Sequence, residues 1–356
     1  QSELSRLARE DARGRLYGAS ASRGSENNIP GLIEAVQLRA ERAELLGFAT
    51  HADYVIAEET AATADAARTM LFDLAPAAAA NAEGGQDLLA DEATLNGQGF
   101  SAADWPYWES KARARDFSLD EEELRKYFPL DQVLEKGVFA AAERLYGITV
   151  TPRDDLEGYA EGVRVWEVID RDVNHESKGI GLLLTDYFGR PTKRGGAWMS
   201  EFVGQSRLLE RKPVIVNVMG ITKPADGSQP LLNMDEVRTV FHEFGHALHG
   251  LLSDVRYPTF AGTNVPRDWV EFPSQINENW ALDERLVKEY ARHVETGEPI
   301  PDELLAAISA ASEFGQGFAT SEYLGASIID LAWHSLSAAE AAKLEATPEA
   351  VVEFEA

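Results

Sequence analysis

Residues 233–252 read NMDEVRTVFHEFGHALHGLL, and their apolar side chains recur at the spacing of an amphipathic helix. Asn233 and Glu236, three residues apart, form a typical helix start, in which each side chain caps the backbone N–H of the other residue. We therefore predict a helix from Met234 to about Leu252. One face of this helix is apolar and comprises Val237, Val240, Phe241, Phe244, Leu248 and Leu251.

The middle of this predicted helix carries an HExxH pattern, His242-Glu243-Phe244-Gly245-His246. At about 100° per residue the two histidines stand about 40° apart, one turn above the other, so both imidazoles can reach one metal ion. Glu243 lies beside them and can act as a base toward a water molecule without binding the metal. Burying these three side chains without a metal would cost several kcal/mol of desolvation. We predict that His242 and His246 are metal ligands and that Glu243 is the general base.

A third ligand has to come from another part of the chain. His249 falls on the same face, but a straight helix cannot bring three successive turns onto one tetrahedral zinc ion. Glu271 is the better candidate, because a carboxylate from a following helix completes the two-histidine, one-glutamate zinc sites of hydrolases. Gln275 and Glu278 follow on the predicted face of Glu271, and with His249 they are expected to support the ligands. The other histidines are interpreted as separate surface or packing residues: His51, His175, His293 and His334.

Composition excludes several classes of protein. The chain has 33 Lys+Arg against 60 Asp+Glu, a net charge of −27, which argues against binding to nucleic acid or to anionic membrane surfaces. No apolar run reaches the length of a membrane span. The absence of cysteine leaves nitrogen and oxygen donors for a metal, which favours one Zn²⁺ per chain. It also fits a reducing cytoplasm. We expect a cytoplasmic protein, with a monomer favoured.

The periodicity of apolar residues changes along the chain. Residues 1–146 have helical spacing, with Gly84-Gly85 expected to break a helix. Residues 147–232 contain strand-like runs and predict a small β-sheet. Residues 233–356 return to helical spacing. We predict a helical segment over 1–146 and a catalytic region over 147–356. The strand-like runs are Val163–Val168, Leu182–Leu184 and Pro213–Val218.

One segment of the predicted sheet is suited to holding a peptide. Gly195-Gly196 is a turn signal, and Ala197, Trp198 and Met199 follow it. Small residues let another backbone approach closely, and a peptide can pair with the edge strand of a sheet. We predict that Gly196, Ala197, Trp198 and Met199 bind substrate. An interior strand with Trp198 in the core is an equally open interpretation.

These motifs resemble the thimet oligopeptidase family of zinc peptidases, and within it the bacterial peptidyl-dipeptidases. The offset between His242 and Glu271, 271 − 242 = 29, is also that of the family. The resemblance implies a mainly α, zincin-like fold, with a small β-sheet before the active-site helix and two lobes around a deep channel. It implies His242, His246 and Glu271 as zinc ligands and Glu243 as the base. The similar segments are 127–130, 195–199, 222–224, 242–249, 262–275 and 317–320.

The resemblance also implies an activity, the zinc-dependent hydrolysis of short peptides. Release of C-terminal dipeptides is the favoured interpretation. An endo-acting oligopeptidase and a catalytically impaired zinc-binding fragment are the alternatives. Members of the family carry a further N-terminal helical segment and a C-terminal loop rich in glycine and tyrosine. The residues that assist the oxyanion and bind the substrate carboxylate are therefore expected beyond Ala356.

Overall fold

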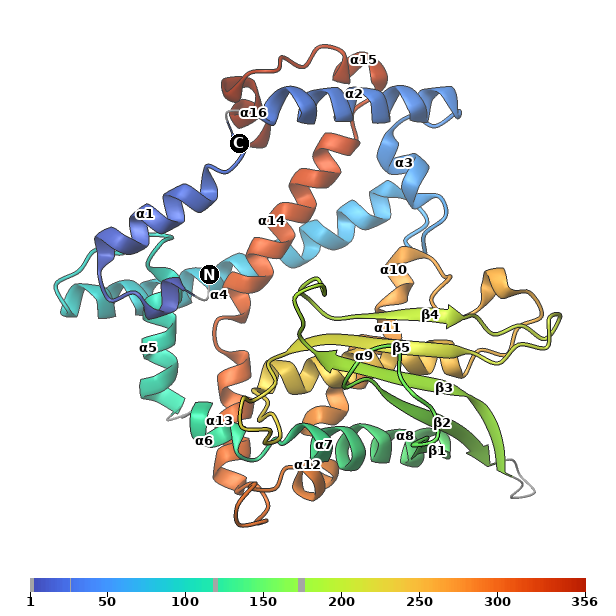
Figure 1. Ribbon diagram of the computed structural model, residues 1–356. Helices are drawn as coiled ribbons and strands as arrows, with labels where there is room; N and C mark the ends of the chain where they lie inside the picture. The colour runs from blue at the N-terminus through green and yellow to red at the C-terminus, as the bar shows by residue number, and fades with distance from the viewer. Residues whose placement is uncertain (1–2, 26, 118–120, 172–176) are drawn as a thin grey trace. The chain divides into compact units, whose positions relative to one another are not determined.

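A small mixed β-sheet carries the site. The computed structural model describes residues 3–25, 27–117, 121–171 and 177–356, and in this part of the chain five strands form one sheet of order β1-β2-β3-β5-β4 (Figure 1). β3 and β5 run parallel, and the other neighbouring strands are antiparallel. β4 is therefore an edge strand that pairs with β5. The strands are β1 (Ile148–Pro152), β2 (Arg164–Arg171), β3 (Ser177–Phe188), β4 (Trp198–Val203) and β5 (Val214–Ile221).

Helices make up most of the remaining chain, so the prediction of a mainly α protein with a small sheet is confirmed. None of the described helices is long and apolar enough to cross a membrane. The helices of the described chain are η1 (Leu4–Arg6), α1 (Glu10–Ala21), α2 (Ile29–Leu45), α3 (His51–Ile56), α4 (Ala64–Leu95), α5 (Trp105–Phe117), α6 (Glu121–Arg125), α7 (Leu130–Gln132), η2 (Val133–Val138), α8 (Phe139–Tyr146), α9 (Met234–Leu251), η3 (Pro258–Phe260), α10 (Arg267–Val270), α11 (Phe272–Glu278), η4 (Asn279–Leu282), α12 (Glu284–Tyr290), α13 (Asp302–Glu313), α14 (Gln316–His334), α15 (Ala338–Ala341) and α16 (Pro348–Glu355).

The break expected at Gly84-Gly85 was wrong, because α4 continues through both glycines. Each glycine costs a helix about 1 kcal/mol relative to alanine. Packing of α4 against α5 offsets this cost, and a Cβ on Gly85 would make only ordinary contact with the Trp105 indole at 3.8 Å. Helix α14 also packs along α4. Local propensity therefore yields to packing at this point.

Helix α9 packs across one face of the sheet (Figure 1). It begins where the sequence predicted, because both halves of the capping box form. The Asn233 side chain accepts from the Glu236 N–H at 2.7 Å, and the Glu236 carboxylate accepts from the Asn233 N–H at 2.8 Å. At the other end, Gly250 lets Ile215 of β5 pack directly on the helix, because a Cβ would lie 2.7 Å from that side chain. The helix is thus fixed at its start and packed closely at its end.

The chain divides into two compact units. Unit 1 comprises Gln1–Leu119 and Ala306–Ala356, and unit 2 comprises Asp120–Leu305. This division differs from the boundary expected after residue 146. Helices α7 and α8 belong with the sheet, because they contribute to the core beneath α9: the rings of Phe139 and Phe244 lie 5.5 Å apart. The C-terminal helices belong with the N-terminal ones, because α14 packs on α4.

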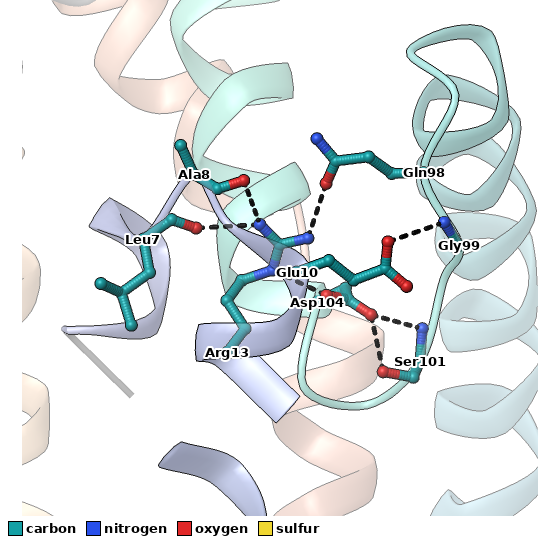
Figure 2. Close-up of polar contacts among 8 residues, drawn as sticks. All are labelled: Leu7, Ala8, Glu10, Arg13, Gln98, Gly99, Ser101 and Asp104. Atoms are coloured by element: carbon teal, nitrogen blue, oxygen red, sulfur yellow. Dashed lines mark hydrogen bonds and ion pairs between the residues drawn. The ribbon is translucent and has the colours of Figure 1, made fainter. Parts of the chain in front are cut away.

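A buried ion pair joins two parts of unit 1 that are far apart in sequence (Figure 2). Arg13 is fully buried, and its Nε donates to Asp104 Oδ1 at 2.7 Å. The same guanidinium donates to the Leu7 carbonyl and the Gln98 side chain, both at 2.8 Å. Asp104 in turn accepts from the backbone N–H and the hydroxyl of Ser101. The network ties the start of the chain to the connection between α4 and α5.

Candidate metal centre

Three predicted ligands meet at one point of unit 2. Ligand atoms of His242, His246 and Glu271 all lie within 4.8 Å of one another. Glu271 Oε2 is 3.2 Å from His242 Nε2 and 3.0 Å from His246 Nε2. The two imidazole centroids are 4.9 Å apart, and the ring planes are nearly perpendicular at 84°. The cluster thus has the arrangement expected of histidines one turn apart on α9.

The contacts of the His242 ring fit a cation at this cluster. Its Nδ1 lies 2.7 Å from Glu278 Oε1, and because a carboxylate only accepts, Nδ1 carries the proton. A neutral His242 ring, the form that binds a metal, would then present its Nε2 lone pair toward Glu271 Oε2, 3.2 Å away. Nitrogen and oxygen lone pairs directed at one point repel one another unless a cation lies among them. Two imidazoles and one carboxylate are a donor set that suits zinc. Glu278, predicted as a supporting residue, orients His242.

A glycine of the HExxH motif brings Glu271 to the histidines. A Cβ on Gly245 would lie 2.6 Å from Ser274 Cα and 3.0 Å from the Pro273 carbonyl, so only glycine lets α11 pack this closely on α9. Glu271 lies at the junction of α10 and α11. The buried Ser274 hydroxyl lies 2.8 Å from the Glu271 carbonyl and 3.0 Å from Glu271 Oε2. Ser274 was not among the predicted site residues, although its position three residues after Glu271 was a signal.

Two other predicted supporting residues lie differently. Gln275 is exposed, and its backbone N–H, rather than its side chain, donates to the Glu271 carbonyl at 2.9 Å. The expected shared face holds for Glu278, whose Oε1 lies 2.7 Å from His242 Nδ1, but not for the exposed side chain of Gln275. His249 is half-buried and does not join the three-residue cluster in the described chain. Burial lowers the pKa of His249 and also that of His246, which favours the neutral imidazole that a metal requires.

Glu243 lies beside the cluster in a low-dielectric environment. Its side chain is only 4% exposed, and within the described chain its Oε2 has no hydrogen-bond partner. Burial raises the pKa of Glu243 to about 7, while the nearby His242 acts in the opposite direction. A carboxyl group with a pKa near neutrality can accept a proton and return it. Glu243 lines a cavity of about 300 Å³, and the other lining residues are Ala197, Trp198, Met199, His242, His246, Thr263, Val270 and Glu271.

One wall of this cavity comes from the segment predicted to hold peptide. Ala197, Trp198 and Met199 line it, and β4 is the edge strand beside β5. The interior strand considered for Trp198 is therefore not what the structure has, although this side chain packs in part against the core near Val163. Gly196 lies just before this segment with φ +97°, a conformation that favours glycine.

Two histidines expected to stand apart lie together in unit 1. The rings of His51 and His334 have centroids 4.9 Å apart, although 283 residues separate them (334 − 51). Arg39 Nη1 lies 2.8 Å from His334 Nε2, and Arg42 Nη2 lies 3.4 Å from His51 Nδ1. The sequence spacing gave no signal of this contact. His175 lies outside the described residues.

Comparison with known proteins is consistent with this geometry. The profile of peptidase family M3 matches residues 4–353. The chain belongs to peptidase family M3. The M3 assignment covers both units, and it confirms the family resemblance inferred from the motifs. Members of family M3 are zinc metallopeptidases, in agreement with the donor set of the cluster.

Individual M3 relatives match along most of the chain. Dipeptidyl carboxypeptidase of Escherichia coli (strain K12) is 44% identical over 326 residues, which is 90% of this chain and 47% of the relative. Dipeptidyl carboxypeptidase of Salmonella typhimurium (strain LT2) is 40% identical over 367 residues, 100% of this chain and 52% of the relative. Oligopeptidase A of Salmonella typhimurium is 35% identical over 316 residues, 84% of this chain and 45% of the relative. The chain thus spans about half the length of these curated relatives.

Proposed function

We propose that this chain forms the zinc-binding catalytic part of a peptidase that releases dipeptides from the C-terminus of short peptides. The observation that carries the proposal is the convergence of His242, His246 and Glu271 in one cavity with Glu243. Two relatives named dipeptidyl carboxypeptidase, at 44% and 40% identity, favour the release of dipeptides over internal cleavage.

Each residue of the cluster has a separate role in this proposal. His242, His246 and Glu271 would hold one Zn²⁺, with Glu278 orienting His242 through its Nδ1. Bound zinc supplies a Lewis acid that polarises the scissile carbonyl and lowers the pKa of a water molecule. Glu243 would accept the proton of the attacking water and return it to the amine of the leaving dipeptide. Its burial supports this role, because a carboxylate deprived of water is a stronger base.

The edge position of β4 supports a mode of peptide binding. One side of β4 pairs with β5, and in the described chain no strand pairs with its other side. An extended peptide can add to such an edge through backbone hydrogen bonds. The start of β4 lines the cavity, so a peptide paired there would pass its carbonyl groups across the cluster. Ala197 keeps this approach free of large side chains.

An endo-acting oligopeptidase is the second candidate, favoured by the similarity to oligopeptidase A at 35% identity. A third candidate is a zinc-binding but catalytically impaired fragment. For all three we propose short peptides rather than nucleic acid as ligands, a cytoplasmic location and a monomer. The net charge of −27 supports the exclusion of nucleic acid.

One set of measurements separates these candidates. Zinc content is measured by elemental analysis after dialysis, and products are identified by mass spectrometry on one peptide with a free and with an amidated C-terminus. We expect stoichiometric zinc, and dipeptide release that amidation abolishes. Internal cleavage of both peptides would favour the oligopeptidase. Bound zinc with no cleavage of either peptide would favour the impaired fragment. Absence of zinc would refute the proposal.

The variant Glu243→Gln tests the base. It should keep the zinc, because Glu243 is not a ligand, and lose at least about a hundredfold in rate, the contribution typical of a general base. Near-normal turnover by this variant would contradict the assigned role.

A further inference from the structure

Asn217 is a buried polar residue that the proposed reaction does not yet use. It lies in β5, is fully buried, and its Nδ2 donates to the Glu243 carbonyl on α9 at 2.7 Å. Its Oδ1 has no hydrogen-bond partner in the described chain. A carboxamide with only part of its hydrogen-bonding capacity used is costly in an apolar core. The bond to Glu243 is therefore the main polar interaction that this side chain gains in the fold.

The position of Asn217 in the sheet connects two walls of the cavity. In the antiparallel ladder of β4 and β5, Asn217 lies directly opposite Met199. Opposed residues share one face of a sheet, so both side chains lie on the face that α9 covers. Met199 of the edge strand lines the cavity, and so does Glu243 of α9, together with His242 and His246. Asn217 thus makes two connections. Its backbone pairs with the edge strand β4, and its side chain bonds to the backbone of Glu243.

This link differs in kind from the contacts around it. Helix α9 also packs on the sheet through apolar contacts, such as that of Ile215 against Gly250. Apolar contacts are not directional and allow small shifts of a helix along a sheet. A hydrogen bond of 2.7 Å from a buried amide fixes one carbonyl of the helix relative to one residue of the strand. The fixed carbonyl belongs to Glu243 itself.

We propose that Asn217 is a positioning residue that sets the distance between the peptide-holding edge strand and the carboxylate of Glu243. The inference rests on the proposed function, because it assumes that peptide pairs with β4 and that Glu243 is the base. A misplacement of about 1 Å between reacting groups can cost about a hundredfold in rate. The loss of the link should therefore lower kcat more than it raises KM.

The chain offers a matched control on the same helix. Asn277 of α11 is also buried, and its Nδ2 donates to the Phe241 carbonyl at 2.6 Å. The Phe241 and Glu243 carbonyls flank His242, so each asparagine donates to the same turn of α9. Asn277, however, ties α9 to the helix that follows Glu271, and not to the edge strand. Its loss should affect zinc binding rather than the alignment of peptide and base.

The test compares Asn217→Leu with Asn277→Leu in the zinc-loaded chain. We expect Asn217→Leu to keep zinc and KM within about threefold while kcat falls at least tenfold. Asn277→Leu should lower zinc affinity at least tenfold, with kcat largely recovered at saturating zinc. Identical signatures in the two variants, or a normal kcat in Asn217→Leu, would overturn the proposal. If Asn217→Leu does not fold, Asn217→Ser replaces it, since a serine hydroxyl is too short to reach Glu243.

A second measurement does not depend on turnover. Hydrogen–deuterium exchange should rise in both α9 and β4 for Asn217→Leu, and in α9 and α11 but not β4 for Asn277→Leu. Unchanged exchange in β4 of Asn217→Leu would overturn the link even if the wild-type chain cleaved no peptide. Absence of cleavage by the wild-type chain would instead refute the proposed function and leave the exchange result to decide on the link.

Discussion

Gly245→Ala is the substitution that should separate the third ligand from the two histidines. The added Cβ would lie 2.6 Å from Ser274 Cα, 3.0 Å from Asn277 Cβ and 3.0 Å from the Pro273 carbonyl. Ordinary contact between carbon atoms needs about 3.5–4.0 Å, so α11 has to retreat by about 1 Å. Two of these three neighbours are backbone atoms, which cannot rotate away as a flexible side chain can.

That retreat is large compared with the tolerance of a metal site. Metal–ligand distances are held to within about 0.2 Å, and Glu271 precedes the helix that has to move. We expect zinc affinity, measured by competition with a chromophoric chelator, to fall by at least about tenfold. Overpacking should also cost about 1–3 kcal/mol of stability.

Gly325→Ala in α14 is the matched control, because a Cβ there meets nothing within 4 Å. Replacing a helical glycine that has open space around it should stabilise the protein slightly, by up to about 1 kcal/mol, and should leave the zinc affinity unchanged. Wild-type zinc affinity in Gly245→Ala would refute the argument that close packing of α11 places Glu271.

Three further predictions concern the sheet and unit 1. Arg13→Met should destabilise the chain by about 3–5 kcal/mol in urea unfolding, because Asp104 is left buried without its cation. Arg9→Met removes an exposed ion pair and should cost far less, and equal losses in the two variants would contradict this. Burial and neighbouring cationic groups lower the pKa of His51 from 6.5 to about 4. Between these two pH values the unfolded chain binds the proton and the folded chain does not, so the free energy of unfolding should decrease as the pH falls from 6.5 to about 4. The melting temperature of His51→Phe should fall less over the same range, and parallel slopes would argue against the effect. Ala197→Pro should raise KM several-fold with zinc content unchanged, because it removes an N–H beside β4, and an unchanged KM in the folded variant would count against peptide pairing at this edge.

The parts of the site that depend on local sequence could be predicted. His242 and His246 are one helical turn apart, and the Asn233–Glu236 pair marks the start of that helix, so the spacing alone places both imidazoles on one side. Glu271 was predicted as the third ligand because a carboxylate completes such sites and because its offset of 29 residues from His242 is shared with a known family. Its approach to the histidines depends on Gly245, whose role is visible only when α11 is in place.

The remaining contacts depend on distant segments and left no periodic signal. Asn217 reaches Glu243 from a different strand, and Arg13 reaches Asp104 across 91 residues. In the sequence, neither Asn217 nor Arg13 lies in a motif or at a spacing that indicates its partner. The placing of α7 and α8 in the same unit as the sheet also depends on tertiary packing. The helical spacing of apolar residues indicates which face of a helix is buried, but not which element covers that face. These are the features for which a three-dimensional structure was needed.

The discontinuity of unit 1 has a consequence for synthesis on the ribosome. Residues 1–119 are made before unit 2, but their partner segment 306–356 emerges only after the 186 residues of that unit (305 − 119). At roughly 5–20 residues per second this is a delay of roughly 10–40 s. During that interval α4 lacks α14, while unit 2 is contiguous and can complete its own core. The nascent chain therefore exposes the face of α4 that α14 later covers before unit 2 has formed its metal cluster.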